Sequence, residues 1–369
     1  MNDLPSTRLE IDLQALEHNF TYFKKQIRKE TKIIAAVKAN AYGTDAVAVG
    51  KQLEALGVDY LAVVFTREGI ALRKAGIKTP IIVFQAMPRE ISQLVEYQLE
   101  PSLYSDSMFR AFSVYAEENN LNEYPVHVKF NTGMNRLGMA LSQAESLGIA
   151  FETSNNLKLK SIFTHFAESD DKTHKEFTEK QIRKFNRVSK ELESALGYMP
   201  MRHACNTMGV LNYPEAHYEA VRIGIGLYGY TYDKKINEKL KVVGRLVAPI
   251  IQKQYLNPGD SISYNRKFIA EVPMIIATIP LGHADGINRA YGNGKGWVYL
   301  NGRKAPILGN VCMDMVMIDV TEIACDEGDL VEVFGENNSA IDLANSIGTI
   351  YYELIAGVTN RVPRHIIEN

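Results

Sequence analysis

Short apolar runs alternate with longer amphipathic stretches over the first two thirds of the chain. The runs predict eight strands, because each is short, apolar and bounded by polar or glycine positions. Between them, apolar residues recur at helical spacing, as at Ile182, Phe185 and Val188. The expected strands are 33–37, 60–64, 81–84, 101–104, 125–129, 160–163, 201–204 and 220–223. Strict alternation of strand and helix predicts a parallel sheet, and eight repeats favour a closed (β/α)8 TIM-type barrel. An open doubly wound sheet is the alternative, but the glycine fingerprint after its first strand is missing.

The pattern changes after about residue 235. Segments rich in β-branched residues follow one another, separated by turn signals such as Asn-Pro-Gly-Asp at 257–260. Expected strands lie within 242–251, 275–279, 297–300, 316–320 and 330–334, with a helix near 340–346. We therefore predict a barrel domain at 10–235 and a mostly antiparallel β-rich C-terminal domain at 236–369. Residues 1–9 are assigned to the second domain, and the strand-like segment 8–13 is a candidate to pair with it.

Composition narrows the class of protein. A hydrophobic content of 46% and a charged content of 23% are ordinary for a soluble enzyme, and a net charge of −2 gives no bias toward nucleic acid. No uncharged run approaches the roughly 18 residues that span a bilayer. The three cysteines show no CxxC spacing, and the first ten residues lack an apolar signal core. We expect a cytoplasmic protein with a small-molecule substrate, no nucleic-acid or membrane partner, and no metal site.

Lys38 closes the first predicted strand and is the leading candidate for chemistry. A lysine at the end of a buried strand loses hydration, so its pKa falls, and a neutral amine forms a Schiff base with an aldehyde. A solvated lysine at the start of a loop is the alternative. Active sites of (β/α)8 barrels lie where the strands end, and His165, Asn206 and Arg222 fall in that same layer.

The residues after the last two predicted strands indicate an anion site. Phosphate commonly binds in the loops after strands 7 and 8 of such barrels. Gly224 would let the backbone approach a ligand, a helix starting there would point free N–H groups at an anion, and Thr207 would add a hydroxyl. Glycines after a strand also fit a simple tight turn. Their position after strand 8 favours a phosphate opposite Lys38.

Ordered motifs throughout the chain resemble those of the alanine racemase family. They lie at 38–43 (Lys-Ala-Asn-Ala-Tyr-Gly), 129–138, 164–167, 222–229, 263–264, 282–286, 312–314 and 361–364. The resemblance covers both predicted domains. It implies a fold-type III enzyme that uses pyridoxal 5'-phosphate to interconvert L- and D-alanine through an aldimine, supplying D-alanine for bacterial cell-wall peptidoglycan.

The resemblance also implies the site residues. Lys38 would hold the cofactor and act as one catalytic base, and Tyr264 would be the second base on the opposite face. Arg222 would face the pyridine nitrogen. The cofactor-binding residues implied are Lys38, Tyr42, Arg136, His165, Asn206, Thr207, Arg222, Gly224, Ile225 and Tyr352. The substrate-binding residues implied are Lys129, which is carbamylated in several members, Arg136, Met313 and Asp314. Family members contribute the last two and Tyr264 from the other subunit, which implies a homodimer with composite sites.

Some positions depart from the usual family pattern. His283 stands where tyrosine is usual, Asn131 where aspartate is usual, and Asn310 where arginine is frequent. None removes a catalytic group, but His283 bears on substrate access and Asn131 on carbamylation of Lys129. A broader amino acid or serine racemase stays open, as does a fold-type III amino acid decarboxylase. Decarboxylases generally place a carboxylate, not an arginine, at the pyridine nitrogen. A non-catalytic cofactor-binding protein would not need the second domain.

Overall fold

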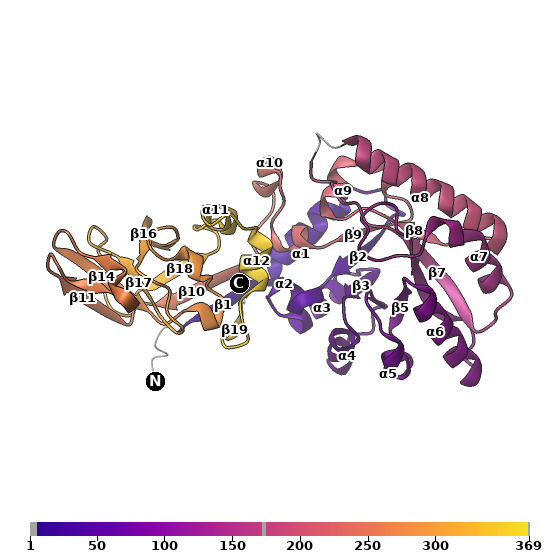
Figure 1. The fold of residues 1–369 in the computed structure, drawn as a ribbon, viewed down its shortest axis with the longest axis horizontal. Coiled ribbons are helices and arrows are strands. Elements are labelled where there is room, and N and C mark those ends of the chain that lie inside the picture. The colour runs from indigo at the N-terminus through magenta and orange to yellow at the C-terminus, as the bar shows by residue number, and fades with distance from the viewer. Residues whose placement is uncertain (1–5, 172–174, 368–369) are drawn as a thin grey trace. The chain divides into compact units, whose positions relative to one another are not determined.

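The chain forms two compact units in the computed structural model, which describes residues 6–171 and 175–367 (Figure 1). The barrel unit comprises the described residues of Glu17–Ala41 and Ala46–Leu240. The β unit comprises residues 6–16, Tyr42–Asp45 and 241–367. No helix in the described ranges is both long enough and apolar enough to cross a membrane.

The barrel unit contains a closed parallel barrel, as the sequence predicts. Its strands are β2 (Lys32–Ala36), β3 (Tyr60–Val63), β4 (Ile81–Val83), β5 (Glu100–Leu103), β6 (Tyr124–Lys129), β7 (Leu157–Phe163), β8 (Met201–His203) and β9 (Ala220–Ile223). The barrel closes because β9 pairs in parallel with β2, for example Ile34 with Arg222. Strand β7 starts three residues before the predicted segment, since Leu157 and Leu159 are also buried.

Helices alternate with these strands along the chain (Figure 1). They are α1 (Leu13–Lys24), α3 (Ala46–Ala55), α4 (Thr66–Lys74), α5 (Ile91–Glu96), α6 (Asp106–Glu118), α7 (Ala144–Glu152), α8 (Lys175–Leu196), α9 (Thr207–Asn212) and α10 (Lys234–Asn237). The predicted apolar face of α8 is buried at Ile182, Phe185, Val188 and Leu192. An apolar stripe of this kind holds an amphipathic helix against the sheet.

The β unit is built on a nine-stranded sheet in the order β11-β14-β17-β16-β15-β18-β10-β1-β19. Its strands are β1 (Arg8–Asp12), β10 (Gly244–Pro249), β11 (Gln252–Leu256), β14 (Met274–Ile279), β15 (Trp297–Leu300), β16 (Arg303–Leu308), β17 (Val316–Asp319), β18 (Leu330–Phe334) and β19 (Arg364–Ile367). A separate hairpin pairs β12 (Ser261–Ile262) with β13 (Phe268–Ile269). The helices are α11 (Ala340–Ser346), as predicted, and α12 (Tyr351–Ala356). The pairing is antiparallel except between β1 and β19.

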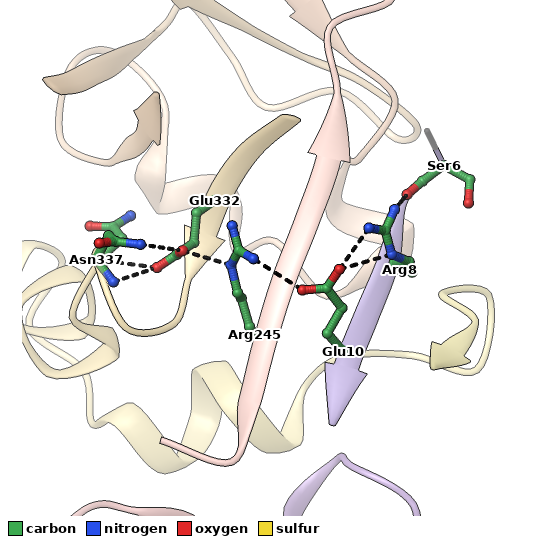
Figure 2. Close-up of polar contacts among 7 residues, drawn as sticks. Ser6, Arg8, Glu10, Arg245, Glu332 and Asn337 are labelled. Carbon is green, nitrogen blue, oxygen red and sulfur yellow. Dashed lines mark hydrogen bonds and ion pairs between the residues drawn. The ribbon is translucent and has the colours of Figure 1, made fainter. Parts of the chain in front are cut away.

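The strand expected at 8–13 pairs with β10 of the β unit but ends one residue early, at Asp12. The Asp12 carboxylate accepts the backbone N–H groups of Gln14 and Ala15, so helix α1 begins at Leu13. A chain of charges also fixes β1 in the sheet (Figure 2). Arg245 donates to Glu332 Oε2 at 2.8 Å and to Glu10 Oε2 at 3.2 Å, and Arg8 pairs with the other oxygen of Glu10 at 2.6 Å.

Candidate functional site

Arg222 lies at the end of β9 and organises the mouth of the barrel. Its Nη1 donates to the Nδ1 atom and the carbonyl of His203 at 2.8 and 3.0 Å. Its Nη2 donates to the carbonyls of Thr164 and Ala204 at 2.7 and 2.8 Å, and lies 3.1 Å from His165 Nδ1. These bonds occupy the terminal N–H groups, whereas Nε–H has no acceptor within the described ranges. The guanidinium therefore has one donor left for a ligand.

Burial lowers the pKa of Arg222 to about 10, a value at which the guanidinium still carries its charge near neutral pH. Because arginine only donates, the Nδ1 atom of His165 must accept, and the ring proton sits on Nε2. Burial, together with the charges of Arg222 and nearby lysines, holds the pKa of His165 well below its ordinary value. His165 is thus a neutral ring whose orientation is set by Arg222.

Lys38 follows β2 and opens an unusual turn, α2 (Lys38–Tyr42). Ala39, Asn40, Ala41 and Tyr42 all adopt left-handed backbone angles, with φ between 52° and 55°. Glu68 anchors the start of this turn, because its Oε1 accepts Ala39 N–H at 2.7 Å while Oε2 accepts the N–H groups of Val64 and Phe65. One carboxylate thereby links the lysine-bearing turn to the start of α4.

The barrel mouth concentrates positive charge. Burial lowers the pKa of the Lys38 ammonium, the guanidiniums of Arg136 and Arg222 lower it further, and Glu68 opposes the shift. Burial and the same arginines lower the pKa of Lys129 to about 8. Desolvated lysines beside arginines are more easily deprotonated, and such a cluster favours an anionic ligand.

The predicted anion site is formed by a short 3-10 turn, η5 (Ile225–Tyr228), with Gly224 at its N-cap. Thr207 Oγ1 accepts the N–H groups of Gly224 and Gly226 at 3.2 and 3.4 Å, so its own O–H is left to donate. Gly226 admits no side chain, because a Cβ there would lie 2.4 Å from the Phe23 ring. The first N–H of a helical turn lacks an intrahelical partner, which leaves Ile225 N–H for an acceptor.

Asn206 lies at the N-cap of α9, after β8. Its side-chain oxygen caps α9 by accepting Gly209 N–H at 2.8 Å and also accepts from Ser169 Oγ at 2.7 Å. Asn131, similarly, bonds within its own loop to the N–H groups of Gly133 and Asn135. Both amides position backbone around the site.

Tyr264 lies in the β unit on a strained loop, η6 (Tyr264–Arg266), between β12 and β13. Ser263 has φ of 67° and Asn265 has φ of 60°, both in the left-handed region. Ser263 Oγ donates to the carbonyl of Asn310 at 3.0 Å, and Asn310 Nδ2 donates to the carbonyl of Tyr264 at 3.1 Å. The loop holds the Tyr264 side chain out, 73% exposed.

Other motif residues gather in the same unit. Gly282 packs against the Met313 carbonyl so closely that a Cβ would lie 2.3 Å from it. Arg361 donates to Asp314 Oδ1 at 2.7 Å and lies 3.4 Å from Asp285. Tyr42 and Tyr352 stand with ring centroids 6.2 Å apart. His283 lines a cavity of about 290 Å³ together with Tyr291, whose buried hydroxyl has no partner in the described ranges.

Glu68 and His203 are residues of the site that were not predicted from the sequence. A glutamate at the third position of helix α4 is a known N-terminal signal, and His203 ends a barrel strand, so both had a readable cue. Neither cue reveals that the residue contacts the turn after Lys38 or the guanidinium of Arg222.

The barrel, its desolvated lysine, the unused Arg222 donor and the N–H groups after β9 define a class of enzyme that binds a phosphorylated, lysine-reactive cofactor at the barrel mouth. Family models agree: the alanine racemase N-terminal domain matches residues 11–232 and the C-terminal domain matches 243–366. The chain belongs to the alanine racemase family.

Individual relatives span nearly the full length. Alanine racemase 1 of Clostridium acetobutylicum is 37% identical over 98% of this chain and 95% of its own. The Treponema denticola alanine racemase is 37% identical, covering 98% of both chains. Among solved structures, alanine racemase of Clostridium difficile 630 superposes with a TM-score of 0.92 at 31% identity, over 99% and 96% of the two chains. That of Bartonella henselae, with covalently bound pyridoxal phosphate, has a TM-score of 0.89 at 26% identity, over 98% and 100%.

Enzymes of this family depend on pyridoxal phosphate, and the residues present fit that group. Arg222 offers its unused Nε–H to an acceptor such as a pyridine nitrogen. Thr207 and the Ile225 N–H suit phosphate oxygens, and Lys38 has the lowered pKa that a carbonyl-reactive amine requires.

Proposed function

We propose that this protein interconverts L- and D-alanine, with Lys38 and Tyr264 as its two catalytic bases. The observation that supports it most is the pairing, at one barrel mouth, of a desolvated Lys38 with an Arg222 whose terminal nitrogens are engaged and whose Nε–H is not. When bound, pyridoxal phosphate supplies an electron-withdrawing ring that acidifies the Cα proton of the amino acid attached to it.

Arg222 binds the ring nitrogen by donation and does not protonate it, since an arginine gives up its proton only with difficulty. An arginine in this position would therefore keep the bound cofactor a weak electron sink, which would disfavour side reactions other than racemisation. This role separates the protein from the decarboxylases of the same fold, which generally use a carboxylate there. His165 contributes as a neutral ring whose Nδ1 atom accepts a hydrogen bond from Arg222, and this bond sets the orientation of the ring.

Lys38 takes and returns the Cα proton on one face. It must be neutral to do so, and its lowered pKa favours that form. Tyr264 acts on the other face, because racemisation requires a proton to leave one face of Cα and return on the opposite one. We propose that the substrate is bound on its carboxylate side by four residues: Arg136, Lys129, Met313 and Asp314. Thr207, Gly224 and Ile225 are proposed to bind the phosphate, with Tyr42 and Tyr352 as further ligands. Asn206 is proposed to contribute to cofactor binding beside Thr207.

The protein is proposed to act as a homodimer in which Tyr264, Met313 and Asp314 serve the partner's site. Tyr264 and Met313 are 73% and 57% exposed, and the residues that precede them, Ser263 and Cys312, lie 3.6 Å apart from Oγ to Sγ. Large exposed side chains gathered in one part of a surface are typical of an interface, which supports the proposal. The barrel domain at 10–235 would carry the cofactor and the β-rich domain at 236–369 the second base. The free cysteines Cys205, Cys312 and Cys325 fit a reducing, cytoplasmic setting.

A covalent trapping experiment tests the assignment of Lys38. The protein is incubated with pyridoxal phosphate, reduced with borohydride, digested and analysed by mass spectrometry. We expect the pyridoxyl group on Lys38 in the wild type and in a Lys129→Ala control. Labelling of Lys129, or of surface lysines only, would overturn the assignment.

A further inference from the structure

A line of buried polar side chains runs from Arg222 through the interior of the barrel. It passes through His203 at the end of β8, Ser161 in β7, His127 in β6 and Glu100 at the start of β5. His203, Ser161 and His127 have no exposed surface and Glu100 is 9% exposed. Polar groups at such depth are costly unless each finds a partner.

Every neighbouring pair in this line is within hydrogen-bond distance. Arg222 Nη1 lies 2.8 Å from His203 Nδ1, and His203 Nε2 lies 2.9 Å from Ser161 Oγ. Ser161 Oγ lies 2.5 Å from His127 Nδ1, and His127 Nε2 lies 2.9 Å from Glu100 Oε2. The line is therefore continuous from a guanidinium to a carboxylate.

The direction of each bond follows from the first. Arginine only donates, so His203 Nδ1 accepts and the His203 proton must sit on Nε2, from which it is donated to Ser161. The Ser161 hydroxyl then has its own proton free for His127 Nδ1. His127 in turn carries its proton on Nε2 and donates it to the Glu100 carboxylate, which can only accept. One arrangement of protons satisfies all five groups.

We propose that Glu100, His127 and Ser161 are positioning residues that fix the tautomer of His203 and through it the orientation of Arg222. A proton on His203 Nδ1 would oppose the Arg222 N–H and turn the guanidinium away from the ring nitrogen. Because the Ser161 oxygen accepts a hydrogen bond from His203 Nε2, the ring proton of His203 stays on Nε2. Phe163 assists by stacking on the His203 ring at 4.7 Å and 7°. The proposal rests on the proposed role of Arg222 in binding the cofactor.

Two serines provide a matched comparison. Ser102 in β5 and Ser161 in β7 are both fully buried, and Ser102 pairs in register with His127. The Ser102 hydroxyl, however, has no hydrogen-bond partner in the described ranges. Ser161→Ala and Ser102→Ala therefore remove the same atom from neighbouring places in the barrel, and only the first breaks the line.

The tautomers are measured by NMR of ¹⁵N-histidine-labelled protein prepared without cofactor. We expect His127 and His203 to be neutral with the proton on Nε2 in the wild type and in Ser102→Ala, and His127 to change in Ser161→Ala. A proton on Nδ1 of either ring in the wild type would overturn the proposal without recourse to any variant. Glu100→Gln retains an oxygen acceptor and should preserve the wild-type signals, whereas Glu100→Ala should alter those of His127.

Cofactor affinity distinguishes a role in positioning Arg222 from a role that only provides hydrogen-bond partners for buried polar groups. Ser161→Ala should bind pyridoxal phosphate about tenfold more weakly, the scale expected for losing one buried hydrogen bond, and Ser102→Ala should stay within about twofold of wild type. Equal affinities in the two folded variants would refute the positioning role and leave the racemase function standing. A wild type that binds no cofactor would refute the proposed function, while the tautomer measurement would still report on the line itself.

Discussion

Replacing Ala39 with glycine should stabilise the protein, although glycine usually destabilises regular structure. Ala39 is the first of four consecutive residues in the left-handed turn after Lys38, with φ of 53°. A left-handed conformation costs a non-glycine residue roughly 1–2 kcal/mol, so Ala39→Gly removes about that much strain. The greater freedom of glycine in the unfolded chain costs about 0.4–1 kcal/mol. The net expectation is a gain of roughly 0.5–1 kcal/mol.

Ala71 supplies the control. It is an exposed alanine in the right-handed helix α4, as Ala39 is an exposed alanine in a left-handed turn. Ala71→Gly should lower stability by about 0.5–1 kcal/mol. Thermal unfolding of the two variants, without cofactor and at one pH, should shift the midpoint in opposite directions. If both variants unfold earlier by similar amounts, the turn is not strained in the way its backbone angles indicate.

Further predictions concern the site. Lys38→Ala should abolish turnover, and Tyr264→Phe should be impaired more from L-alanine than from D-alanine; equal loss in both directions would count against one base per enantiomer. Asn310→Ala should lower turnover a few-fold by releasing the Tyr264 carbonyl, whereas Asn301→Ala, which loses a similar bond to the Ala324 carbonyl, should not. The pKa of Lys129 near 8 lies below the ordinary 10.5, so between those pH values the folded protein binds fewer protons than the unfolded chain, and its stability falls as the pH falls from about 10.5 to about 8. Carbamylation of Lys129 needs the neutral amine. In ¹³C NMR with labelled bicarbonate, a carbamate signal that is absent in Lys129→Ala should therefore grow as the pH rises through about 8. A signal that does not depend on pH would refute this.

The barrel could be predicted from the sequence because its strands are short, mostly buried runs that alternate with amphipathic helices. The strands of the β unit were harder to predict from the sequence. Strand β16, Arg303–Leu308, carries charged residues and Pro306, and β11 is largely exposed, so neither forms the apolar run that marked the other strands. Such strands are stabilised by their neighbours in the sheet and not by their own pattern.

Some residues of the site could be predicted from the sequence, and others could not. Lys38, His165 and Arg222 stand out because polar residues at the ends of buried strands are rare. The left-handed turn is not readable, since Ala39 and Ala41 ordinarily favour right-handed helix. Ser161 and His127 meet through the register of β6 and β7, which includes a shift between Val126 and His127. No local pattern in the sequence encodes that shift, so the buried line required the structure.

A chiral assay of the purified protein with added pyridoxal phosphate, starting from L-alanine alone, tests the proposed racemase activity. L-serine and L-lysine run in parallel, and Lys38→Ala serves as the blank. We expect D-alanine, absent from the blank and formed well ahead of D-serine. Carbon dioxide release from lysine, or no D-alanine from protein that has bound the cofactor, would contradict it.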